Sequence, residues 1–332
     1  MLANRVQYPN CSPDAEMVWM QIMKLSQLRN LIAVAECGSV QAAARQLGLT
    51  QPSITRSIRD LEQDLGVALF ERSGSGMALT VLGQAVLRRA GGVQTELGRI
   101  RDEVAQLTGR SSGIVSVGLS FVAHAGLLPK VIGAFRRTAP NVRLEIKESL
   151  FAAVESDLQN GVFDFYVGPV LPGRHYDGKL TIEPLFENRR QIYCRRGHPL
   201  SMASSLAELG DASWVTASSA RNSQDELAAL FRHYGLSPPR VAVNVQTMLS
   251  MMSIAGSSDL LTALPQQLQE LLGLKSNLVR IPVRERLLSA TICIVKRTST
   301  PLTPAAEMLS DLFRRAAITH ATSLPDTEPL VR

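Results

Sequence analysis

The chain has 332 residues, of which 45% are hydrophobic, and carries a formal net charge of +6. This length suffices for two or more folded domains, and the positive charge suits a polyanionic partner such as nucleic acid. No uninterrupted apolar stretch approaches the roughly 20 residues of a membrane span, and residues 1–22 lack the basic start and apolar core of a signal peptide. We therefore expect a cytoplasmic protein without a membrane partner.

The cysteines and histidines give no sign of a metal or redox centre. The four cysteines show neither the paired spacing of a disulfide framework nor metal-ligand spacing, and the five histidines are equally scattered. No glycine-rich phosphate-binding loop is present. We expect reduced thiols, no metal and no cofactor.

The first recognisable element is a helix over residues 24–37. Residues 1–22 have little periodicity and contain Pro9 and Pro13, so we expect a disordered extension there. From Leu25 to Ala35, apolar residues recur on one helical face, which predicts a helix that closes a small core.

Residues 40–65 are typical of two short helices joined by a tight turn. Val40, Ala44 and Leu47 share one face of the first helix, and Gly48 supplies the permissive turn residue. Thr50 stands where an N-cap belongs, and Pro52 is tolerated in the first turn of a helix that begins near Gln51. This spacing predicts a helix-turn-helix, with a plain helical hairpin as the alternative.

The second helix carries a polar face suited to reading the major groove. Ile54, Ile58 and Leu61 form its buried stripe, so the polar residues lie on the remaining surface, where Gln can bond adenine and Arg guanine. The start of the preceding helix and a wing arginine that could position the DNA backbone add to this face. The expected DNA-contacting residues are therefore Val40, Gln41, Gln51, Pro52, Ser53, Thr55, Arg56, Arg59 and Arg72.

Residues 69–80 predict the wing of a winged helix-turn-helix, because two short apolar segments flank a Gly/Ser tip. The segment from Met23 resembles the N-terminal domain of LysR-type transcriptional regulators. The resemblance rests on Ala-Ala-Ala-Arg-Gln-Leu at 42–47, Thr-Gln-Pro-Ser at 50–53, Leu-Glu at 61–62, Leu-Phe-Glu-Arg at 69–72 and Leu-Thr-x-x-Gly at 79–83. One departure is Ser75 at the wing tip, where the family often has Arg or Lys.

Residues 80–108 carry an oligomerisation signal. Apolar residues alternate steps of four and three, which is the heptad pattern of a helix that pairs with a second copy; a helix packed on its own domain is the alternative. The seam consists of Val86, Ala90, Val93, Leu97, Ile100, Val104 and Leu107. Gly91 and Gly92 predict a bend, and the resemblance implies a linker helix that pairs DNA-binding domains.

After residue 113 the pattern alternates strands with helices, which predicts an α/β fold with a mostly parallel sheet. The resemblance implies two lobes like those of a periplasmic binding protein, with the last strand and helix returning to the first lobe. The expected domains are a disordered extension (1–22), a winged helix-turn-helix (23–80), a linker helix (81–111), a regulatory domain (112–318) and a disordered tail (319–332). The first lobe of the regulatory domain would cover about 112–183 and 287–318, and the second lobe about 184–286.

Ligands in such sheets bind beyond the carboxyl ends of strands, which makes Ser120, directly after the first strand, the leading effector-binding candidate. The resemblance adds further cleft residues: Phe121, Val122, Ser149, Phe151, Thr216, Ser218, Gln246 and Thr247. Hydroxyls and amides suit a small anion such as a carboxylate or sulfonate, and Phe151 could stack on an aromatic ring.

The sequence favours a regulator over an enzyme. Gly118-Leu119-Ser120 begins like a nucleophile elbow but lacks the closing glycine. A hydrolase built on the C-terminal domain, or a DNA-binding protein without an effector, remains the alternative. The resemblance implies double-stranded promoter DNA and a small anionic effector as partners, RNA polymerase as a further candidate partner, and assembly as a homo-oligomeric dimer of dimers.

Overall fold

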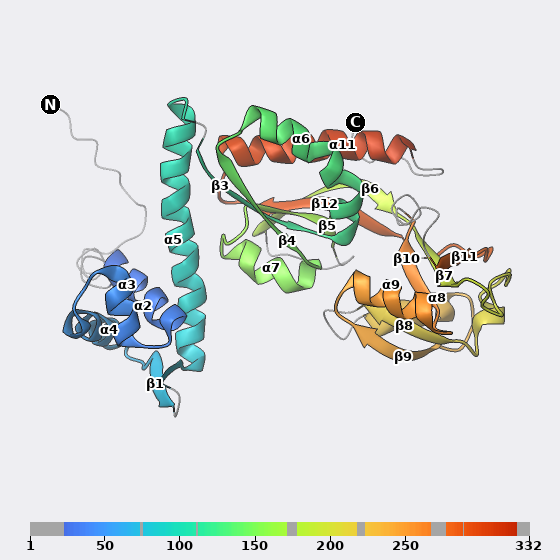
Figure 1. Cartoon of the computed structure of the whole chain (residues 1–332), viewed down its shortest axis with the longest axis horizontal. Helices are drawn as coiled ribbons and strands as arrows, with labels where there is room; N and C mark the ends of the chain where they lie inside the picture. Colours follow the sequence, from blue (N-terminus) through green and yellow to red (C-terminus); the bar gives the residue numbers. More distant parts are fainter. Residues whose placement is uncertain are drawn as a thin grey trace. The chain divides into compact units, whose positions relative to one another are not determined.

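The computed structural model of the chain describes residues 23–73, 76–110, 112–170, 178–217, 223–266, 277–287 and 289–323. The chain divides into two compact units, Met1–Leu97 and Gly98–Arg332, each described by itself below (Figure 1). The expected extension at 1–22 lies outside the described residues. Within those residues, no helix has the length and apolar character needed to span a membrane.

Three helices, a two-stranded wing and the beginning of a long helix make up the described part of the first unit. Helices α2 (Leu25–Cys37), α3 (Val40–Leu47) and α4 (Gln51–Leu65) precede strands β1 (Phe70–Ser73) and β2 (Gly76–Leu79). The strands pair antiparallel. Leu31, Ile54 and Leu61 are fully buried in the shared core. The structure thus has the expected winged helix-turn-helix.

Capping residues set the expected ends of α3 and α4. The Ser39 hydroxyl accepts a hydrogen bond from the Ala42 N–H, and the Thr50 hydroxyl accepts one from the Ser53 N–H. Gly48 ends α3 with φ 64°, in the left-handed region that glycine adopts without strain. The local turn chemistry therefore fixes where the second helix begins.

The long helix α5 (Val81–Leu107) starts directly after the wing. Thr80 caps it, because its hydroxyl accepts from the Gly83 N–H at 2.9 Å and donates to the Ala68 carbonyl at 2.9 Å. A Cβ at position 83 would clash with the Leu69 carbonyl, which explains the glycine in Leu-Thr-x-x-Gly. The helix is unbroken through Gly91 and Gly92, where the sequence predicted a bend.

A five-stranded sheet, in the order β4-β3-β5-β12-β6, forms the first lobe of the second unit. Strands β3 (Gly113–Leu119), β4 (Val142–Glu148) and β5 (Phe165–Pro169) are parallel, and β12 (Ala290–Arg297) runs antiparallel between β5 and β6 (Leu180–Asn188).

Helices cover both faces of this sheet. Helices α6 (Leu128–Thr138) and α11 (Pro304–Ser323) pack on one face, and α7 (Phe151–Gln159) lies on the other (Figure 1). A short π-helix, η1 (Ala123–Leu127), leads into α6. The main core lies between the sheet and the α6–α11 pair.

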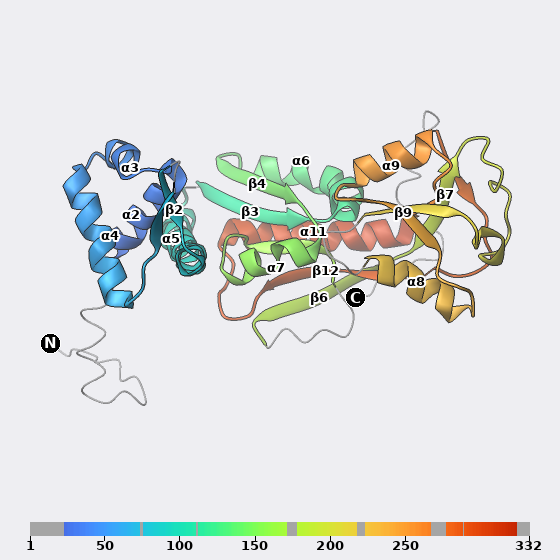
Figure 2. The same ribbon diagram turned by 90° about the horizontal axis from the view of Figure 1, so that it is seen from below.

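The second lobe contains two small sheets. Strand β7 (Arg190–Arg195) pairs with β10 (Thr262–Pro265) and β11 (Leu278–Ile281), and β8 (Ser213–Ala217) runs parallel to β9 (Arg240–Val245). Helices α8 (Ser223–His233) and α9 (Met248–Ser257) pack on opposite faces (Figure 2), and η2 (Ala207–Leu209) is a single 3₁₀ turn.

In the second unit, the structure corrects two expectations and adds one strand. The expected lobe boundary at 183/184 falls inside β6, which pairs with β12 along its length, so the first lobe extends to Asn188. The expected tail at 319 is wrong up to residue 323, because α11 continues and His320 is fully buried against the core; residues 324–332 lie outside the described part. Strand β11 was not predicted.

Candidate DNA interface and effector site

The first two turns of α4 present a polar surface. Gln51, Ser53, Arg56 and Arg59 are exposed, as is Pro52, whereas Ile54 and Ile58 face the core. Thr55 is half-buried, and its hydroxyl donates to the Gln51 carbonyl at 3.0 Å. The expected reading face is thus accessible, with Thr55 already bonded within its own helix.

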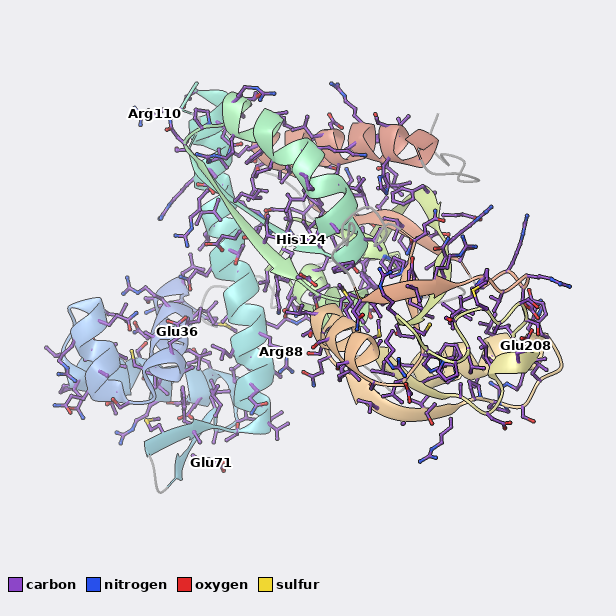
Figure 3. The ribbon with its side chains drawn as sticks, turned by 45° about the vertical axis from the view of Figure 1, so that its right-hand side comes forward. Glu36, Glu71, Arg88, Arg110, His124 and Glu208 are labelled. Atoms are coloured by element: carbon purple, nitrogen blue, oxygen red, sulfur yellow. The ribbon has the colours of Figure 1, made fainter. Side chains whose placement is uncertain are left out.

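The other expected DNA residues differ in accessibility. Gln41 is exposed at the start of α3, but Val40 packs against the core of the domain, so its side chain has a structural role. Arg72 lies on β1, paired with Met77, and its side chain is outside the described part. Its neighbour Glu71 is exposed on the wing (Figure 3).

Two polar contacts, which the sequence did not reveal, hold α4 in place. The Glu62 carboxylate accepts hydrogen bonds from the N–H groups of Leu69 and Phe70, at 2.8 and 3.2 Å. The buried Asn30 amide donates to the Ser57 hydroxyl at 2.8 Å. These contacts fix the wing and α2 to α4. The Leu-Glu pair at 61–62, part of the resemblance to the family, was the sequence feature that could have indicated the Glu62 contact.

Ser120 lies at the carboxyl end of β3, as expected, and is only 2% exposed. Its hydroxyl accepts from the Ala123 N–H at 3.3 Å, so in this structure it caps the turn into η1. Gly168 allows this approach, since a Cβ there would press on Ser120 and on the Tyr166 hydroxyl. Burial raises the pKa of Tyr166, which therefore keeps its proton.

Ser149 lies beside Ser120, because β3 and β4 are parallel and end together. The Ser149 N–H donates to the Leu119 carbonyl at 2.9 Å, and Ser149 is half-buried. Phe121 is also half-buried and packs against a cluster of the second lobe that includes Tyr193 and Met251. This edge of the first lobe thus contacts the second lobe.

Two expected effector residues belong to hydrophobic cores instead. Val122 is 4% exposed and packs in the main core of the first lobe. Phe151 is 3% exposed, with its ring centroid 5.3 Å from that of Tyr166. Both residues follow strand ends, as predicted, but their side chains turn into the packing layers, which removes Phe151 as a stacking surface for a ligand.

The second-lobe candidates lie at the carboxyl ends of parallel strands β8 and β9. Thr216 is half-buried, and its hydroxyl is buried with no hydrogen-bond partner among the described residues. Gln246 and Thr247 are exposed, and the Thr247 hydroxyl caps α9 by accepting from the Ser250 N–H. Ser218 lies outside the described residues. Thr216 is thus the second-lobe candidate with an unused polar group.

A buried ion pair fastens the end of α5 to the first lobe. Arg99 Nε donates to Asp164 Oδ1 at 2.8 Å, and Asp164 Oδ2 accepts from the Ser116 N–H at 2.8 Å. The two side chains are 8% and 4% exposed. Burial raises the pKa of Asp164 more than the neighbouring guanidinium lowers it. Sequence reasoning did not pair these residues, which are 65 positions apart.

Two more contacts strengthen this joint. Asp102 accepts from the Ile114 N–H at 3.1 Å, and the Gln106 amide oxygen accepts from the Ala305 N–H at 2.9 Å, at the start of α11. Three polar side chains on successive turns of α5 therefore hold the first lobe.

A winged helix-turn-helix with an accessible polar helix, joined through a long helix to a two-lobed α/β fold, defines a class: DNA-binding regulators with a ligand-binding domain. Residues 25–84 match the family described as "Bacterial regulatory helix-turn-helix protein, lysR family", and residues 108–318 match the "LysR substrate binding domain". The chain belongs to the LysR family of DNA-binding transcriptional regulators.

Known proteins agree with this assignment over nearly the whole chain. It is 26% identical over 301 residues to the regulator GbpR of Azospirillum brasilense, covering 90% of this chain and 87% of that protein. It is 25% identical to TdcA of Escherichia coli K12, covering 89% and 95%. The solved structure of full-length CbnR with its target DNA matches with a TM-score of 0.66 and 26% identity, covering 89% of this chain and all of that one.

Proposed function

We propose that this regulator reads promoter DNA with the first turns of α4 and switches in response to a small anion bound between the ends of β3, β4 and β8. The observation that supports DNA reading by α4 is its exposed polar face of Gln51, Arg56 and Arg59, which lies opposite a fully packed apolar stripe. The chain would act in the cytoplasm, where the promoter DNA lies.

Replacing Gln51 or Arg56 by alanine should cost roughly 1–3 kcal/mol of operator binding, because each removes hydrogen bonds to base edges. Gln63, exposed at the far end of the same helix, provides the control Gln63→Ala, which should bind like the parent. Competition of operator against random duplex, measured by fluorescence anisotropy, separates the two. Unchanged discrimination in both variants would place the reading face elsewhere.

The proposed anion site rests on Ser120, Ser149 and Thr216. The unpartnered Thr216 hydroxyl supports it, since a buried hydroxyl without a hydrogen bond costs free energy that a ligand acceptor would recover. Phe121 packs against the second lobe, so a ligand bound at this edge would change the contact between the two lobes through Phe121. Carboxylates and sulfonates suit a group of hydroxyl donors.

Thr216→Val should weaken binding of such a ligand by roughly 1–3 kcal/mol while keeping side-chain volume, and Ser120→Trp should abolish binding. Calorimetric titration of the full chain with benzoate, benzenesulfonate and acetate provides the measurement, and thermal unfolding checks that each variant is folded. Thr138→Val, at an exposed hydroxyl on α6 that is not among the expected effector residues, is the control. A folded Ser120→Trp protein that binds at parental strength would rule out this site.

We also propose that the protein acts by binding and not by catalysis. The Ser120 hydroxyl interacts with the Ala123 N–H and the Tyr166 phenol, and a protonated phenol cannot activate a nucleophile. This arrangement favours a ligand-binding serine over the hydrolase alternative.

Assembly through α5 completes the proposal. Val86 and Ala90 of the predicted seam pack on the core of their own domain, so those two positions do not face a partner. The other five positions of the seam form an exposed apolar stripe. Their exposed fractions are 42% for Val93, 37% for Leu97, 54% for Ile100, 58% for Val104 and 72% for Leu107. An exposed apolar stripe of this kind is typical of an interaction surface, and a second copy of the helix has the matching spacing to bury it. Dimers would then associate in pairs.

A further inference from the structure

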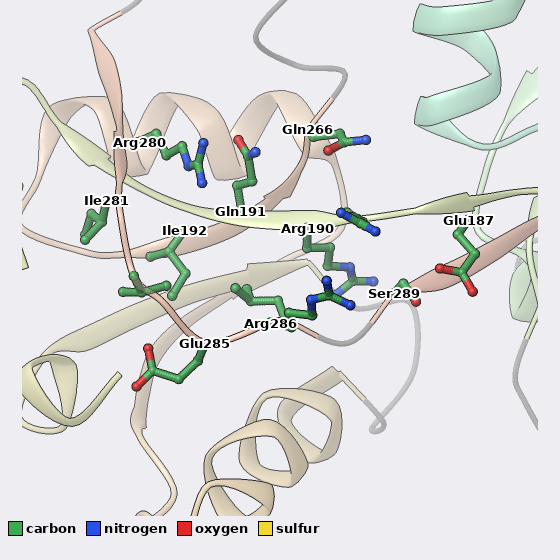
Figure 4. Close-up of a pocket in the computed structure, with 13 residues that line it drawn as sticks. Glu187, Arg190, Gln191, Ile192, Gln266, Arg280, Ile281, Glu285, Arg286 and Ser289 are labelled. Atoms are coloured by element: carbon green, nitrogen blue, oxygen red, sulfur yellow. The ribbon is translucent and has the colours of Figure 1, made fainter. Parts of the chain in front are cut away.

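A buried histidine on α11 lies behind the turn that follows Ser120. His320 is fully buried, and the centroid of its ring is 5.3 Å from that of Phe186 on β6. Phe186 directly precedes Glu187, which lines a hollow of about 330 Å³ beside the crossing from β6 into β7 (Figure 4). The His320 ring thus packs on the end of β6, just before the chain leaves the first lobe.

The same ring contacts η1 and the helix α6 that continues it. A Cβ at Gly126 would lie 3.0 Å from both Nε2 and Cε1 of His320, so a side chain at this position of η1 would press on the ring. Four residues later, on α6, Lys130 Nζ lies 3.3 Å from His320 Nδ1. The ring therefore fixes how η1 is placed relative to the first turn of α6.

The contact with Lys130 determines the protonation state of the ring. An ammonium group has donors and no acceptor, so His320 Nδ1 accepts the hydrogen bond and the ring proton is on Nε2. Burial, together with the charge of Lys130, lowers the pKa of His320 to about 4, which keeps the ring neutral near neutral pH. His320 thus links α11 to α6 by a directional bond that an apolar core residue would not supply.

The π turn η1 decides which way the residues before it face. The Leu128 N–H donates to the Ala123 carbonyl five residues back, so η1 contains one residue more than an α-helical turn. Each helical residue turns the chain by about 100°, so conversion of η1 to an α-helical turn would rotate the preceding residues by that angle relative to α6. Ser120 is bonded directly to this turn, because its carbonyl accepts from the His124 N–H at 2.8 Å. The form of η1 therefore sets the direction of Ser120 and Phe121.

We propose that His320 is a positioning residue for the anion site at Ser120. Its contacts with Gly126 and Lys130 hold η1 as a π turn and so keep Ser120 and Phe121 at the edge of the sheet. This inference rests on the proposed function of that edge. It also gives ligand binding a route into the first lobe, because an anion that displaces Ser120 moves η1 against a ring packed on the end of β6.

Amide hydrogen exchange of the full chain without ligand, followed by mass spectrometry, tests the hold on η1. His320→Leu removes the acceptor and Gly126→Ala presses on the ring, so each should raise exchange at residues 121–128 by roughly threefold or more. Gly133→Ala is the matched control, because a Cβ at this exposed position of α6 makes only an ordinary contact, 3.5 Å from Arg137. Exchange in β5 and β12 should stay parental, which separates a local change from a general loss of stability.

Two amide variants test whether the bond at Nδ1 matters. The amide oxygen of His320→Asn is as many bonds from Cα as Nδ1 is, so it can accept from Lys130. In His320→Gln the amide lies one carbon further out. Exchange at residues 121–128 should therefore return toward the parental rate in His320→Asn and stay raised in His320→Gln.

Lys130→Met tests the ligand site without a change in the core, because Lys130 is exposed. Calorimetric titration uses benzoate, benzenesulfonate or acetate, whichever the parent binds most tightly, and the variant should bind it roughly three- to tenfold more weakly. Arg137→Met, which removes one charge from an exposed position of the same helix, is the control and should bind like the parent.

Parental exchange in His320→Leu and Gly126→Ala would overturn the proposal, as would an equal increase in Gly133→Ala or equal rates in His320→Asn and His320→Gln.

Parental affinity of Lys130→Met, with no binding by Ser120→Trp, would also overturn the role of His320 while leaving the anion site in place. Parental affinity of a folded Ser120→Trp protein, or no binding of any of the three anions by the parent at millimolar concentration, would overturn the anion site itself and this role of His320 with it.

Discussion

Leu97→Asp and Ile100→Asp should each convert the dimer to monomers, because each places two like charges opposite one another in the seam of paired α5 helices. Both residues belong to the exposed apolar stripe. Loss of the dimer removes the second half-site contact, so affinity for a two-site operator should fall about 100-fold or more. Light scattering measures the assembly, and fluorescence anisotropy measures the operator affinity.

Gln84→Asp is the control for this experiment. It adds the same charge at an exposed position of α5 that lies off the stripe, so the assembly should stay as in the parent. If Leu97→Asp and Ile100→Asp keep the parental mass in light scattering, another surface makes the dimer and the stripe has a different partner.

Asp164→Ala should destabilise the second unit by about 3–5 kcal/mol, because it removes the carboxylate that pairs with the buried Arg99 guanidinium. The Ser116 N–H also loses its acceptor. Urea unfolding followed by circular dichroism measures the cost. Since this pair joins α5 to the first lobe, a folded variant should also transmit ligand binding to DNA affinity less well.

Two further variants make this result specific. Arg99→Met combined with Asp164→Ala removes both charges, and the double variant should be more stable than the sum of the single changes predicts. Asp157→Ala breaks the exposed Lys147–Asp157 pair and should cost less than about 1 kcal/mol. A parental unfolding midpoint for Asp164→Ala would show that the buried pair does not hold the joint.

Local chemistry made the DNA-binding half predictable. The caps at Ser39 and Thr50, the glycine at 48 and the apolar spacing of α4 are each decided within a few residues, so the sequence reveals both the elements and the exposed face. The heptad spacing of α5 was equally local. Its first two positions were misassigned because the core of the winged domain, and not the helix itself, decides where Val86 and Ala90 pack.

The regulatory half shows where sequence reasoning ends. The alternation of strands and helices identified the α/β class and placed Ser120 at a strand end, because both follow from short-range periodicity. The membership of β6 in the first sheet depends on its pairing with β12, about a hundred residues later, and the four-residue β11 is a strand only because β7 lies beside it.

The amino-acid sequence by itself determined the helix-turn-helix, the exposed polar face of α4, the apolar stripe of α5 and the edge at which Ser120 lies, since each depends on neighbours within a turn or two. Only the tertiary structure decided that Val122 and Phe151 face cores and that Arg99 meets Asp164. Those contacts join residues far apart in the chain, and packing across elements, which no local pattern records, brings them together.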